Sequence, residues 1–430
     1  MRPFPSGAKA GFFFVLALLV SVPASATDPA QVQPQPAPAA APPVLFAEND
    51  EIPLELRLKT FAFAWETIRD RYFDPAFGGV DWTAVRDAYR PKVEAAKASG
   101  AFHGLLKQML KELGGSHLAV IAPHEMTRER KGDPEQRMSP QGLEVRFVEG
   151  RACFVSVDPE SQAWASGLRP GSILLKVDGA DVPKTLAEVR RAMSGPPQSS
   201  ASLTVLDGND REQTLAVPRT APYQDRANLA RTRLEYRRVH PRVGYIRFDG
   251  WGFDLKPKLE AALNDLWASD ALIIDVRQNR GGVNPGVDYL ASTLLTGSGL
   301  LAVATLRNGE RNDWPFSAGD RRWPGRLAIL VDEASGSASE VFAGAMQEMG
   351  RAVVLGRTSY GGVLNSTQAP LPTGGVLQYP HSDMRTPKGR RIEGAGVVPD
   401  IPVEMRREDL LKGVDTVIER AVEELLSDKK

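Results

Sequence analysis

Three serines, Ser335, Ser337 and Ser339, precede Glu340 in the stretch VDEASGSASEVFAGAMQEMG, which spans residues 331–350. A serine followed three positions later by a glutamate is typical of a capping box, in which both side chains satisfy amides at a helix start. The first amides of a helix lack partners within the helix, and the helix dipole favours negative charge there. A serine at this point could therefore also be a nucleophile with a stabilised oxyanion. The stretch alone leaves the cap and the nucleophile open.

A second loop, QNRGGVNPG, follows the apolar run ALIIDVR. Its Gly281-Gly282 pair would let backbone amides approach a ligand closely, because glycine carries no side chain. One amide of this pair and the amide of Ala338 could form a two-donor oxyanion hole around Ser337, in which each donor is worth about 2.7–4 kcal/mol of barrier. A simple Gly-Gly turn is the alternative.

The elements that must position these loops are alternating strands and helices, from about residue 232 to residue 406. Near-continuous apolar strands such as VGYIRFDGW, ALIIDVR, RLAILVD and AVVLGR, separated by helical segments, predict a parallel sheet covered on both faces. Catalytic groups in such sheets gather at the carboxyl ends of the strands. Both loops follow strands, so we expect them to face one pocket.

The rest of the chain divides into further regions. Apolar residues at helical spacing predict an N-terminal helical domain over residues 50–126 that ends in a strand at LAVI. Residues 127–138 are charged and loop-like. Residues 139–219 alternate short strands with two short helices, and residues 407–430 predict a C-terminal helix.

The N-terminus predicts export. Arg2 and Lys9 precede the short apolar run GFFFVLALLVSV, and Ala24-Ser25-Ala26 follows it, the pattern of a signal peptide over residues 1–26. The apolar run is shorter than the roughly 20 residues that a transmembrane helix needs. A Pro/Ala-rich tether over residues 27–49 follows. We expect a soluble protein in the periplasm or outside the cell, without stable membrane insertion after cleavage; an uncleaved membrane anchor is the alternative.

Composition excludes several function classes. The 430 residues contain 53 Lys plus Arg and 53 Asp plus Glu, so no global field favours nucleic acid or an anionic membrane. Cys153 is the one cysteine, which excludes an internal disulfide and a cysteine-rich zinc site. The sequence contains no HExxH motif, so a zincin is excluded as well. We expect no metal and no organic cofactor.

Residues 165–179, ASGLRPGSILLKVDG, resemble the centre of a PDZ domain. Gly142, Leu143 and Glu144 stand where that family has its carboxylate-binding loop, so the resemblance implies that they bind the C-terminus of a peptide that adds as a strand. An α+β module without a ligand is the alternative, since recognition sites are lost from intact folds.

Three blocks, DVRQNRGG, the stretch from VDEASGSASE to RTSYGG, and RTPKGRRIEGAGVVPDI, occur in the order typical of the carboxy-terminal processing (tail-specific) protease family. The resemblance implies a multidomain α/β fold, with a crotonase-like α/β catalytic core over residues 232–406, a PDZ-like domain and an N-terminal helical domain. It also implies that Ser337 is the nucleophile.

The chain departs from the lysine-type members of this family at one position. Those members have a lysine where this chain has Gly362, in the block Thr358-Ser359-Tyr360-Gly361-Gly362. A serine hydroxyl is a poor nucleophile until an adjacent base takes its proton. The base must therefore lie elsewhere, or the site is inactive.

Residues 113–117, LGGSH, resemble a block of the tricorn core protease branch, in which histidine replaces lysine as the base. That branch also has a glutamate at the position of Glu393. The resemblance implies that His117 is the base and that Ser116 and Glu393 orient it, as the acid of a catalytic triad does. The alternatives are a half-buried strand histidine, a loop serine and a surface ion pair.

The sequence thus predicts an exported serine endopeptidase that cuts polypeptides near their C-termini through an acyl-enzyme. An inactive PDZ-containing scaffold, or a hydrolase of small esters and amides at the same site, are the alternatives. Lys388 is the one lysine that could substitute as base, but an exposed turn lysine keeps a high pKa. The oligomeric state, the substrate and the regulatory sign of the PDZ-like domain stay open. The histidines without motif support are His103, His124, His240 and His381.

Overall fold

The computed structural model describes residues 46–127, 138–140, 142–222 and 232–427. The predicted signal peptide lies outside these ranges, as does the predicted tether up to residue 45. Within the described ranges, no helix combines the length and the apolar character that a membrane-spanning helix needs.

A six-stranded sheet forms the centre of residues 232–406, the expected catalytic core, in the order β18-β15-β14-β11-β10-β9. The five strands from β18 to β10 run parallel, and β9 pairs antiparallel at the edge. This confirms the predicted parallel sheet. The bounds are β9 Leu234–His240, β10 Val243–Phe248, β11 Ala271–Asp275, β14 Arg326–Val331, β15 Val353–Gly356 and β18 Ile401–Pro402.

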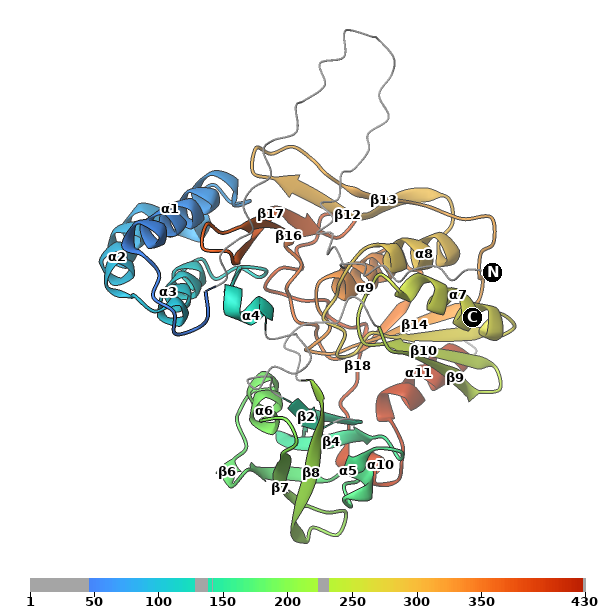
Figure 1. The fold of residues 1–430 in the computed structure, drawn as a ribbon. Helices are drawn as coiled ribbons and strands as arrows, with labels where there is room; N and C mark the ends of the chain where they lie inside the picture. The colour runs from blue at the N-terminus through green and yellow to red at the C-terminus, as the bar shows by residue number, and fades with distance from the viewer. Residues whose placement is uncertain (1–45, 128–137, 141, 223–231, 428–430) are drawn as a thin grey trace, which may run out of the picture. The chain divides into compact units, whose positions relative to one another are not determined.

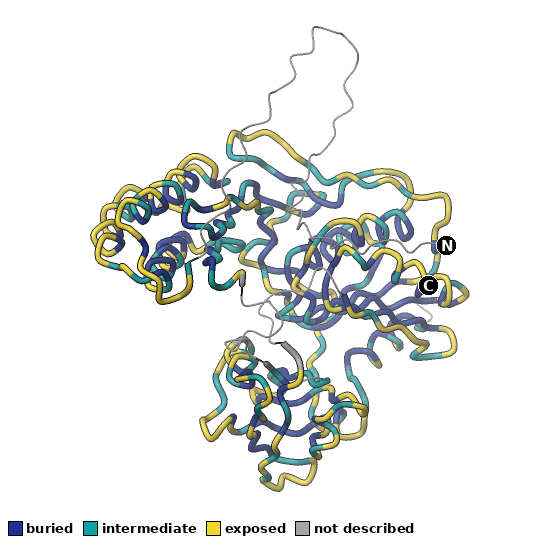
Figure 2. The backbone as a smooth tube through the Cα atoms, in the orientation of Figure 1, coloured by how far each residue is buried: buried dark blue, intermediate teal, exposed yellow. Residues whose placement is uncertain are grey.

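Helices cover both faces of this sheet (Figure 1). One face packs against α7 (Leu255–Leu266), α8 (Pro285–Leu294) and α9 (Ala338–Glu348), and the other against α11 (Thr416–Leu426). Figure 2 shows the consequence, because the buried backbone runs through the strands between the helix layers. Every residue of β11 is buried, as a strand that is covered on both faces requires.

The predicted single C-terminal helix is wrong. Two helices, α10 (Arg407–Leu411) and α11, replace it. Gly413, with a φ of 74°, follows the end of α10, a left-handed conformation that ends helices. Asp415 then starts α11 by accepting from the amides of Val417 and Ile418. The C-terminal segment therefore turns between two helices.

The N-terminal helices share a core with a second sheet. Helices α1 (Leu54–Arg71), α2 (Trp82–Ala95) and α3 (Ser99–Lys111) pack in one cluster with Leu377 and Tyr379 of β17. The predicted strand at LAVI is confirmed as β1 (Ala119–Ile121), which pairs with β17. A short helix, α4 (Pro123–Thr127), follows it, whereas the sequence predicted that the domain ends in the strand. The other strands are β12 Ser298–Leu306, β13 Trp314–Ser317, β16 Asn365–Pro370 and β17 Val376–Arg385.

The PDZ-like segment contains a seven-stranded sheet in the order β2-β8-β7-β5-β4-β3, with β6 beside β5. Both short helices that the sequence predicted are present, and their apolar side chains join one buried cluster with the strands. The helices are α5 (Gln162–Ala165) and α6 (Leu186–Met193), and the strands are β2 Met138–Pro140, β3 Leu143–Val148, β4 Arg151–Val157, β5 Ile173–Val177, β6 Ala180–Asp181, β7 Ser200–Leu206 and β8 Glu212–Pro222.

Candidate active site

Ser337 occupies the N-cap of α9, in the loop after β14. Its backbone has a φ of 53° and a ψ of −117°, whereas an N-cap serine ordinarily has extended backbone. Ser337 and Glu340 form the predicted capping box, in which the Ser337 amide donates to Glu340 Oε2 at 3.0 Å. Left-handed backbone at a residue with a side chain is strained and is concentrated at functional sites. The cap is thus real, but it does not explain the backbone of Ser337.

The Gly281-Gly282 turn lies against the start of α9. A Cβ added to Gly281 would lie 2.6 Å from the Ser337 Cβ and 3.0 Å from the Ala338 amide nitrogen, so only glycine permits this approach. The Gly281 amide already donates to Asn279 Oδ1 at 3.0 Å. The amides of Gly282 and Ala338 have no acceptor among the described residues. They are the pair that could hold an oxyanion beside Ser337.

Ser116, His117 and Glu393 are joined by hydrogen bonds, although 277 positions separate Ser116 from Glu393. The Ser116 hydroxyl lies 2.8 Å from His117 Nδ1 and donates to Glu393 Oε2 at 3.0 Å, and the Ser116 amide donates to Glu393 Oε1 at 2.9 Å. An added Cβ on Gly115 would lie 2.7 Å from the Tyr72 hydroxyl, so the preceding glycine lets the turn fit. The contact of the Ser116 hydroxyl with Nδ1 fixes the orientation of the His117 ring.

Gly362 lies between this relay and the nucleophile. Its carbonyl accepts from the Ser337 amide at 3.0 Å, and a Cβ built on it would lie 3.2 Å from the Ser116 Cβ. In the described part of the chain, no direct hydrogen bond joins the Ser337 hydroxyl to the His117 ring. The structure thus places Ser337 and Ser116 next to Gly362, the position at which the resemblance implies the lysine of lysine-type members.

Burial changes the protonation of the site. Burial lowers the pKa of His117, and the charge of Glu393 partly opposes that change. A neutral imidazole is the form that can accept a proton from a serine. Burial raises the pKa of the Glu340 carboxyl, although hydrogen bonds from Ser359, Gly362, Gly361 and Ser337 act in the opposite direction.

The other candidate bases lie elsewhere. Lys388 is exposed, and its Nζ donates to the Glu348 carbonyl, at the opposite end of α9 from Ser337. His103 is buried and contacts the Ser99 carbonyl and the Thr373 hydroxyl, and burial lowers its pKa to about 4. His103 is thus a satisfied core histidine, and Lys388 is not placed to serve Ser337.

The predicted peptide-binding residues Gly142, Leu143 and Glu144 lie at the start of β3. Gly142 accepts from the Asp158 amide at 2.6 Å, and Leu143 pairs with Val157 of β4. The Glu144 carboxylate accepts from Arg146 and, at 2.6 Å, from Arg247 of the catalytic core. Burial alone would raise the pKa of Glu144, but the two arginines overcome it and lower that pKa. Its side chain therefore forms ion pairs with Arg146 and with Arg247 of the core, and the peptide-binding role of residues 142–144 stays a prediction.

Two residues of the site were missed by the sequence reasoning. Asn279 is fully buried; its side chain accepts from Gly281, and its carbonyl accepts from the Gly336 amide and the Ser339 hydroxyl. Trp251 donates from Nε1 to the same Ser339 hydroxyl at 2.9 Å. Together they join the Gly281-Gly282 turn to the nucleophile loop. The sequence signal for Asn279 was its place in the QNRGG block, next to the Gly281-Gly282 pair.

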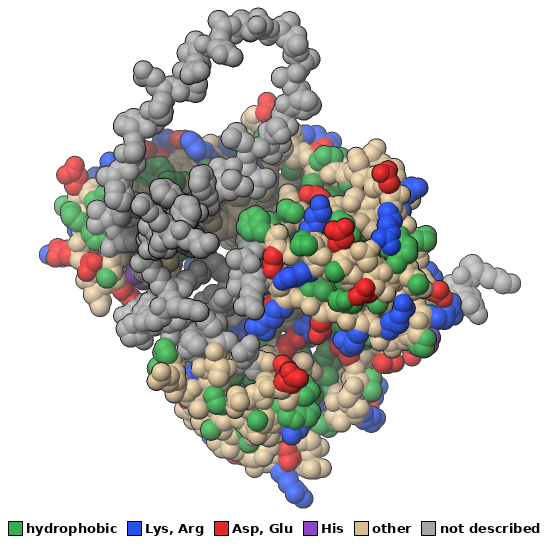
Figure 3. Space-filling model, turned by 45° about the vertical axis from the view of Figure 1, so that its right-hand side comes forward, with side chains coloured by type: hydrophobic (Ala, Val, Ile, Leu, Met, Phe, Trp, Pro, Cys, Tyr) green, Lys and Arg blue, Asp and Glu red, His purple; other side chains and the backbone are tan. Residues whose placement is uncertain are grey.

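Among the described residues, no group of three or more His, Cys, Asp or Glu side chains is arranged to hold a metal ion. Figure 3 shows basic and acidic side chains interspersed over the described surface in that view. The residues drawn there thus present mixed charge and not one broad basic patch.

Sequence profiles match three parts of the chain. Residues 242–403 match peptidase family S41, residues 55–111 match the tricorn protease C1 domain, and residues 154–207 match the PDZ domain. The three matches fall on the catalytic segment, the N-terminal helices and the PDZ-like segment.

Relatives and solved structures agree with these profiles. A carboxyl-terminal-processing protease of Picosynechococcus sp. is 27% identical over 78% of this chain and 81% of its own length. A tricorn protease homologue of Streptomyces coelicolor is 28% identical over 84% of this chain, which spans 31% of that longer protein. The structure titled photosystem II D1 C-terminal processing protease superposes with a TM-score of 0.58 at 22% identity, over 86% of this chain and 97% of that one. The last likeness concerns the fold alone.

Proposed function

Because the chain belongs to the carboxyl-terminal-processing family of serine peptidases and carries a PDZ domain, we propose that it cleaves polypeptides near their C-termini with Ser337 as nucleophile and His117 as base. One observation carries this proposal: Glu393, Ser116 and His117 form a hydrogen-bonded relay, and Ser116 lies beside Gly362, whose carbonyl accepts from the Ser337 amide. The resemblance to lysine-type members implies that their lysine stands at the position of Gly362.

The reaction begins with attack of the Ser337 hydroxyl on the scissile carbonyl carbon. His117 takes the hydroxyl proton, and the negative charge that develops on the carbonyl oxygen is held by the amides of Ala338 and Gly282. His117 then gives its proton to the leaving amine, and an acyl-enzyme remains on Ser337. Water activated by neutral His117 hydrolyses this ester and restores the serine. No step uses a metal or an organic cofactor.

Ser116 and Glu393 orient the base. The Ser116 hydroxyl donates its hydrogen bond to the Glu393 carboxylate. The hydroxyl oxygen of Ser116 is therefore left to accept a hydrogen bond from His117 Nδ1–H. That arrangement leaves Nε2 without a proton and able to act as the base. The negative charge of Glu393 also stabilises the imidazolium that forms when Ser337 attacks, which is the role of the acid in a catalytic triad.

The place and the substrate of the enzyme follow from other regions. The pattern of residues 1–26 supports export, and we assign the enzyme to the periplasm or the outside of the cell. The PDZ domain supports recruitment of a substrate C-terminus, because such domains bind free carboxyl ends as added strands. The names of the relatives support the same substrate class.

A fluorophosphonate tests the catalytic assignment, because it reacts covalently with an activated serine. We expect the adduct on Ser337 and not on Ser335 or Ser339 when the labelled protein is mapped by peptide mass spectrometry. His117→Ala should abolish labelling, whereas His240→Ala, outside the site, should label like the wild type. Labelling at another serine, or undiminished labelling of His117→Ala, would contradict the mechanism.

Peptide pairs test the substrate. The same unfolded peptide, with a free or an amidated C-terminus, should be cut faster in the free form if the PDZ domain recruits a carboxylate. Equal rates would remove C-terminal recruitment while leaving peptide cleavage intact. Turnover of a simple ester without turnover of either peptide would favour a small-molecule hydrolase.

A further inference from the structure

Four consecutive backbone amides, from Gly361 to Leu364, donate to two carboxylates. Gly361 and Gly362 donate to Glu340 at 2.6 and 2.9 Å. The next two residues, Val363 and Leu364, donate to Glu393 Oε2 at 2.8 and 3.3 Å. Because the four amides are adjacent in the chain, the segment fixes the distance between the two carboxylates. We call residues 361–364 the amide bridge.

The first carboxylate belongs to the nucleophile side. Glu340 lies in the first turn of α9, is fully buried, and also accepts from the Ser337 amide and the Ser359 hydroxyl. A capping box needs one of these bonds, the one from the N-cap amide. Burial of a carboxylate is costly unless it is well hydrogen-bonded. Two of the three additional donors, Gly361 and Gly362, belong to the amide bridge, so their bonds hold the bridge against the start of the helix that carries Ser337.

The second carboxylate belongs to the base side. Glu393 accepts from the amide and hydroxyl of Ser116, next to His117, and from the second half of the amide bridge. The Gly394 amide donates back to the Gly361 carbonyl at 2.8 Å. The bridge is thus bound along its length to the group that orients the base.

We propose that Glu340 is a positioning residue for catalysis, which sets the placement of Ser337 relative to the Ser116-His117-Glu393 relay through the amide bridge; this inference rests on the function proposed above. Lysine-type members of the family carry their base on this segment, so it must already lie beside the nucleophile. Here the segment carries no base, and its backbone amides connect Glu340 to Glu393, which belong to different parts of the chain.

Glu340→Gln tests this role because it removes the charge and turns one acceptor into a donor that faces backbone amides. We expect kcat for a peptide to fall about 100-fold, the loss typical of a misplacement of about 1 Å. KM should stay unchanged, because no substrate contact is removed. The rate of fluorophosphonate labelling of Ser337 should fall by the same factor.

The chain offers a matched control on the same helix. Glu348 accepts from the Thr386 hydroxyl at 2.8 Å and from the Lys388 amide at 2.6 Å, at the end of α9 away from Ser337. Glu348→Gln removes a similar set of bonds and should keep kcat within twofold of the wild type. Hydrogen exchange of residues 361–364 should accelerate in Glu340→Gln and not in Glu348→Gln.

The possible outcomes are separable. Labelling of wild-type Ser337 that is lost in His117→Ala would support the proposed function. If, in addition, kcat of Glu340→Gln is unchanged or falls no more than kcat of Glu348→Gln, the positioning role is wrong while the proposed function stands. If wild-type Ser337 is not labelled, the proposed function fails first. If Glu340→Gln no longer melts cooperatively, Glu340→Asp replaces it, because this variant keeps the charge but withdraws it by one methylene. We expect Glu340→Asp to fold and to show the same loss of kcat at constant KM. A wild-type kcat in Glu340→Asp would overturn the proposal.

Discussion

The active site and the junction between the PDZ domain and the catalytic core are held by different kinds of bond. In the active site, backbone amides of the amide bridge donate to the carboxylates of Glu340 and Glu393. At the junction, arginine side chains meet carboxylates and an amide side chain across the two domains. Backbone amides are placed by the path of the chain, whereas long side chains must be ordered for each contact. The active site is therefore held largely by backbone donors within the core, whereas the junction depends on ordered side chains from both domains.

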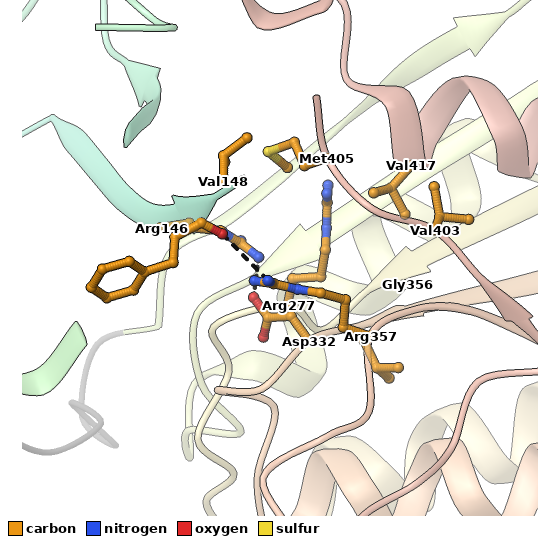
Figure 4. Close-up of a pocket in the computed structure, with 11 residues that line it drawn as sticks. Arg146, Val148, Arg277, Asp332, Gly356, Arg357, Val403, Met405 and Val417 are labelled. Atoms are coloured by element: carbon orange, nitrogen blue, oxygen red, sulfur yellow. Dashed lines mark hydrogen bonds and ion pairs between the residues drawn. The ribbon is translucent and has the colours of Figure 1, made fainter. Parts of the chain in front are cut away.

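The junction centres on Arg146 of β3. Its guanidinium binds Asp332, at the end of β14, and Glu144 of its own strand, which also binds Arg247. Figure 4 shows Arg146 and Asp332 meeting beside Arg277 and Arg357 in the cavity that residues of both domains line. Arg357 donates to the Phe147 carbonyl, which adds a second contact to β3.

Asp332 belongs to both regions. Besides Arg146, its carboxylate accepts from the Gln278 amide at 3.0 Å and from the Ser335 amide at 3.1 Å. These two residues begin the loops that carry the Gly281-Gly282 turn and Ser337. Burial alone would raise the pKa of Asp332, but Arg146 and the Gln278 bonds lower it. A change at the junction would therefore reach both active-site loops through one side chain.

The largest expected effect on activity comes from a change in the active site. Ser337→Ala should lower kcat by about 10⁶-fold, the loss seen when a serine protease loses its nucleophile. The capping box loses its serine as well, so we expect the free energy of unfolding to fall by about 1 kcal/mol. Peptide turnover and chemical denaturation measure the two effects. Intact activity with the same small loss of stability would mean that Ser337 is a cap only.

The second effect tests the junction. Arg146→Met leaves Asp332 without its counter-charge in a site where both side chains are 3–4% exposed. Removing one partner of a buried pair costs about 3–5 kcal/mol. We expect a loss of this size in chemical denaturation, together with faster hydrogen exchange in the two loops that carry the Gly281-Gly282 turn and Ser337.

Arg219→Met is the matched control. Arg219 is another buried arginine of the PDZ domain, with a side chain 4% exposed, but its carboxylate partner Asp178 lies in the same domain. This variant should destabilise the PDZ domain without faster exchange in the active-site loops. Equal hydrogen exchange of the active-site loops in both variants would show that the junction does not stabilise these loops more than any other buried arginine of the PDZ domain does.

The sequence predicted the parts of the site that depend on residue type. Ser116 and Glu393 could be named because the hydroxyl and the carboxylate are recognisable in their blocks, and the structure places them in hydrogen-bond contact. Their catalytic roles stay a prediction. The central parallel sheet was predicted for the same reason, since its strands are near-continuously apolar.

The rest depends on backbone direction, which residue type does not encode. Every residue from Gly361 to Leu364 has an amide, so the sequence could not indicate that these four donate to two carboxylates. The sequence could not indicate the ion pair between Glu144 and Arg247 either, because 103 positions separate the two residues and they lie in different domains. The sheet that contains β12 and β17 was not predicted, because its strands alternate with irregular segments and pair with distant parts of the chain.

A smaller effect is expected at Gly362. A Cβ there would lie 2.7 Å from the Tyr360 ring, which is 67% exposed and can turn away, and 3.2 Å from the Ser116 Cβ, which is held by Glu393. Gly362→Ala should therefore shift the relay by a few tenths of an ångström and lower kcat about tenfold, or about 1.4 kcal/mol of barrier. Gly104→Ala, where an added Cβ meets nothing within 4 Å, should leave kcat unchanged. A wild-type kcat in Gly362→Ala would mean that the relay tolerates displacement.

The smallest effect is a shift in the pH profile, and it separates the charge of the relay from its geometry. His117 must be neutral to accept the serine proton, so kcat/KM falls as pH drops through the pKa of His117 in the free enzyme. Burial lowers this pKa and the negative charge of Glu393 raises it. Glu393→Gln removes the charge that stabilises the imidazolium, so the pKa falls further and the acidic limb should move to lower pH. Glu112→Gln, whose partner is the Tyr89 hydroxyl, should leave the limb in place. A limb that moves to higher pH, or that moves equally in both variants, would show that Glu393 does not act on His117 through its charge, and would leave its hydrogen bonds to Ser116 and the amide bridge as its contribution to the site.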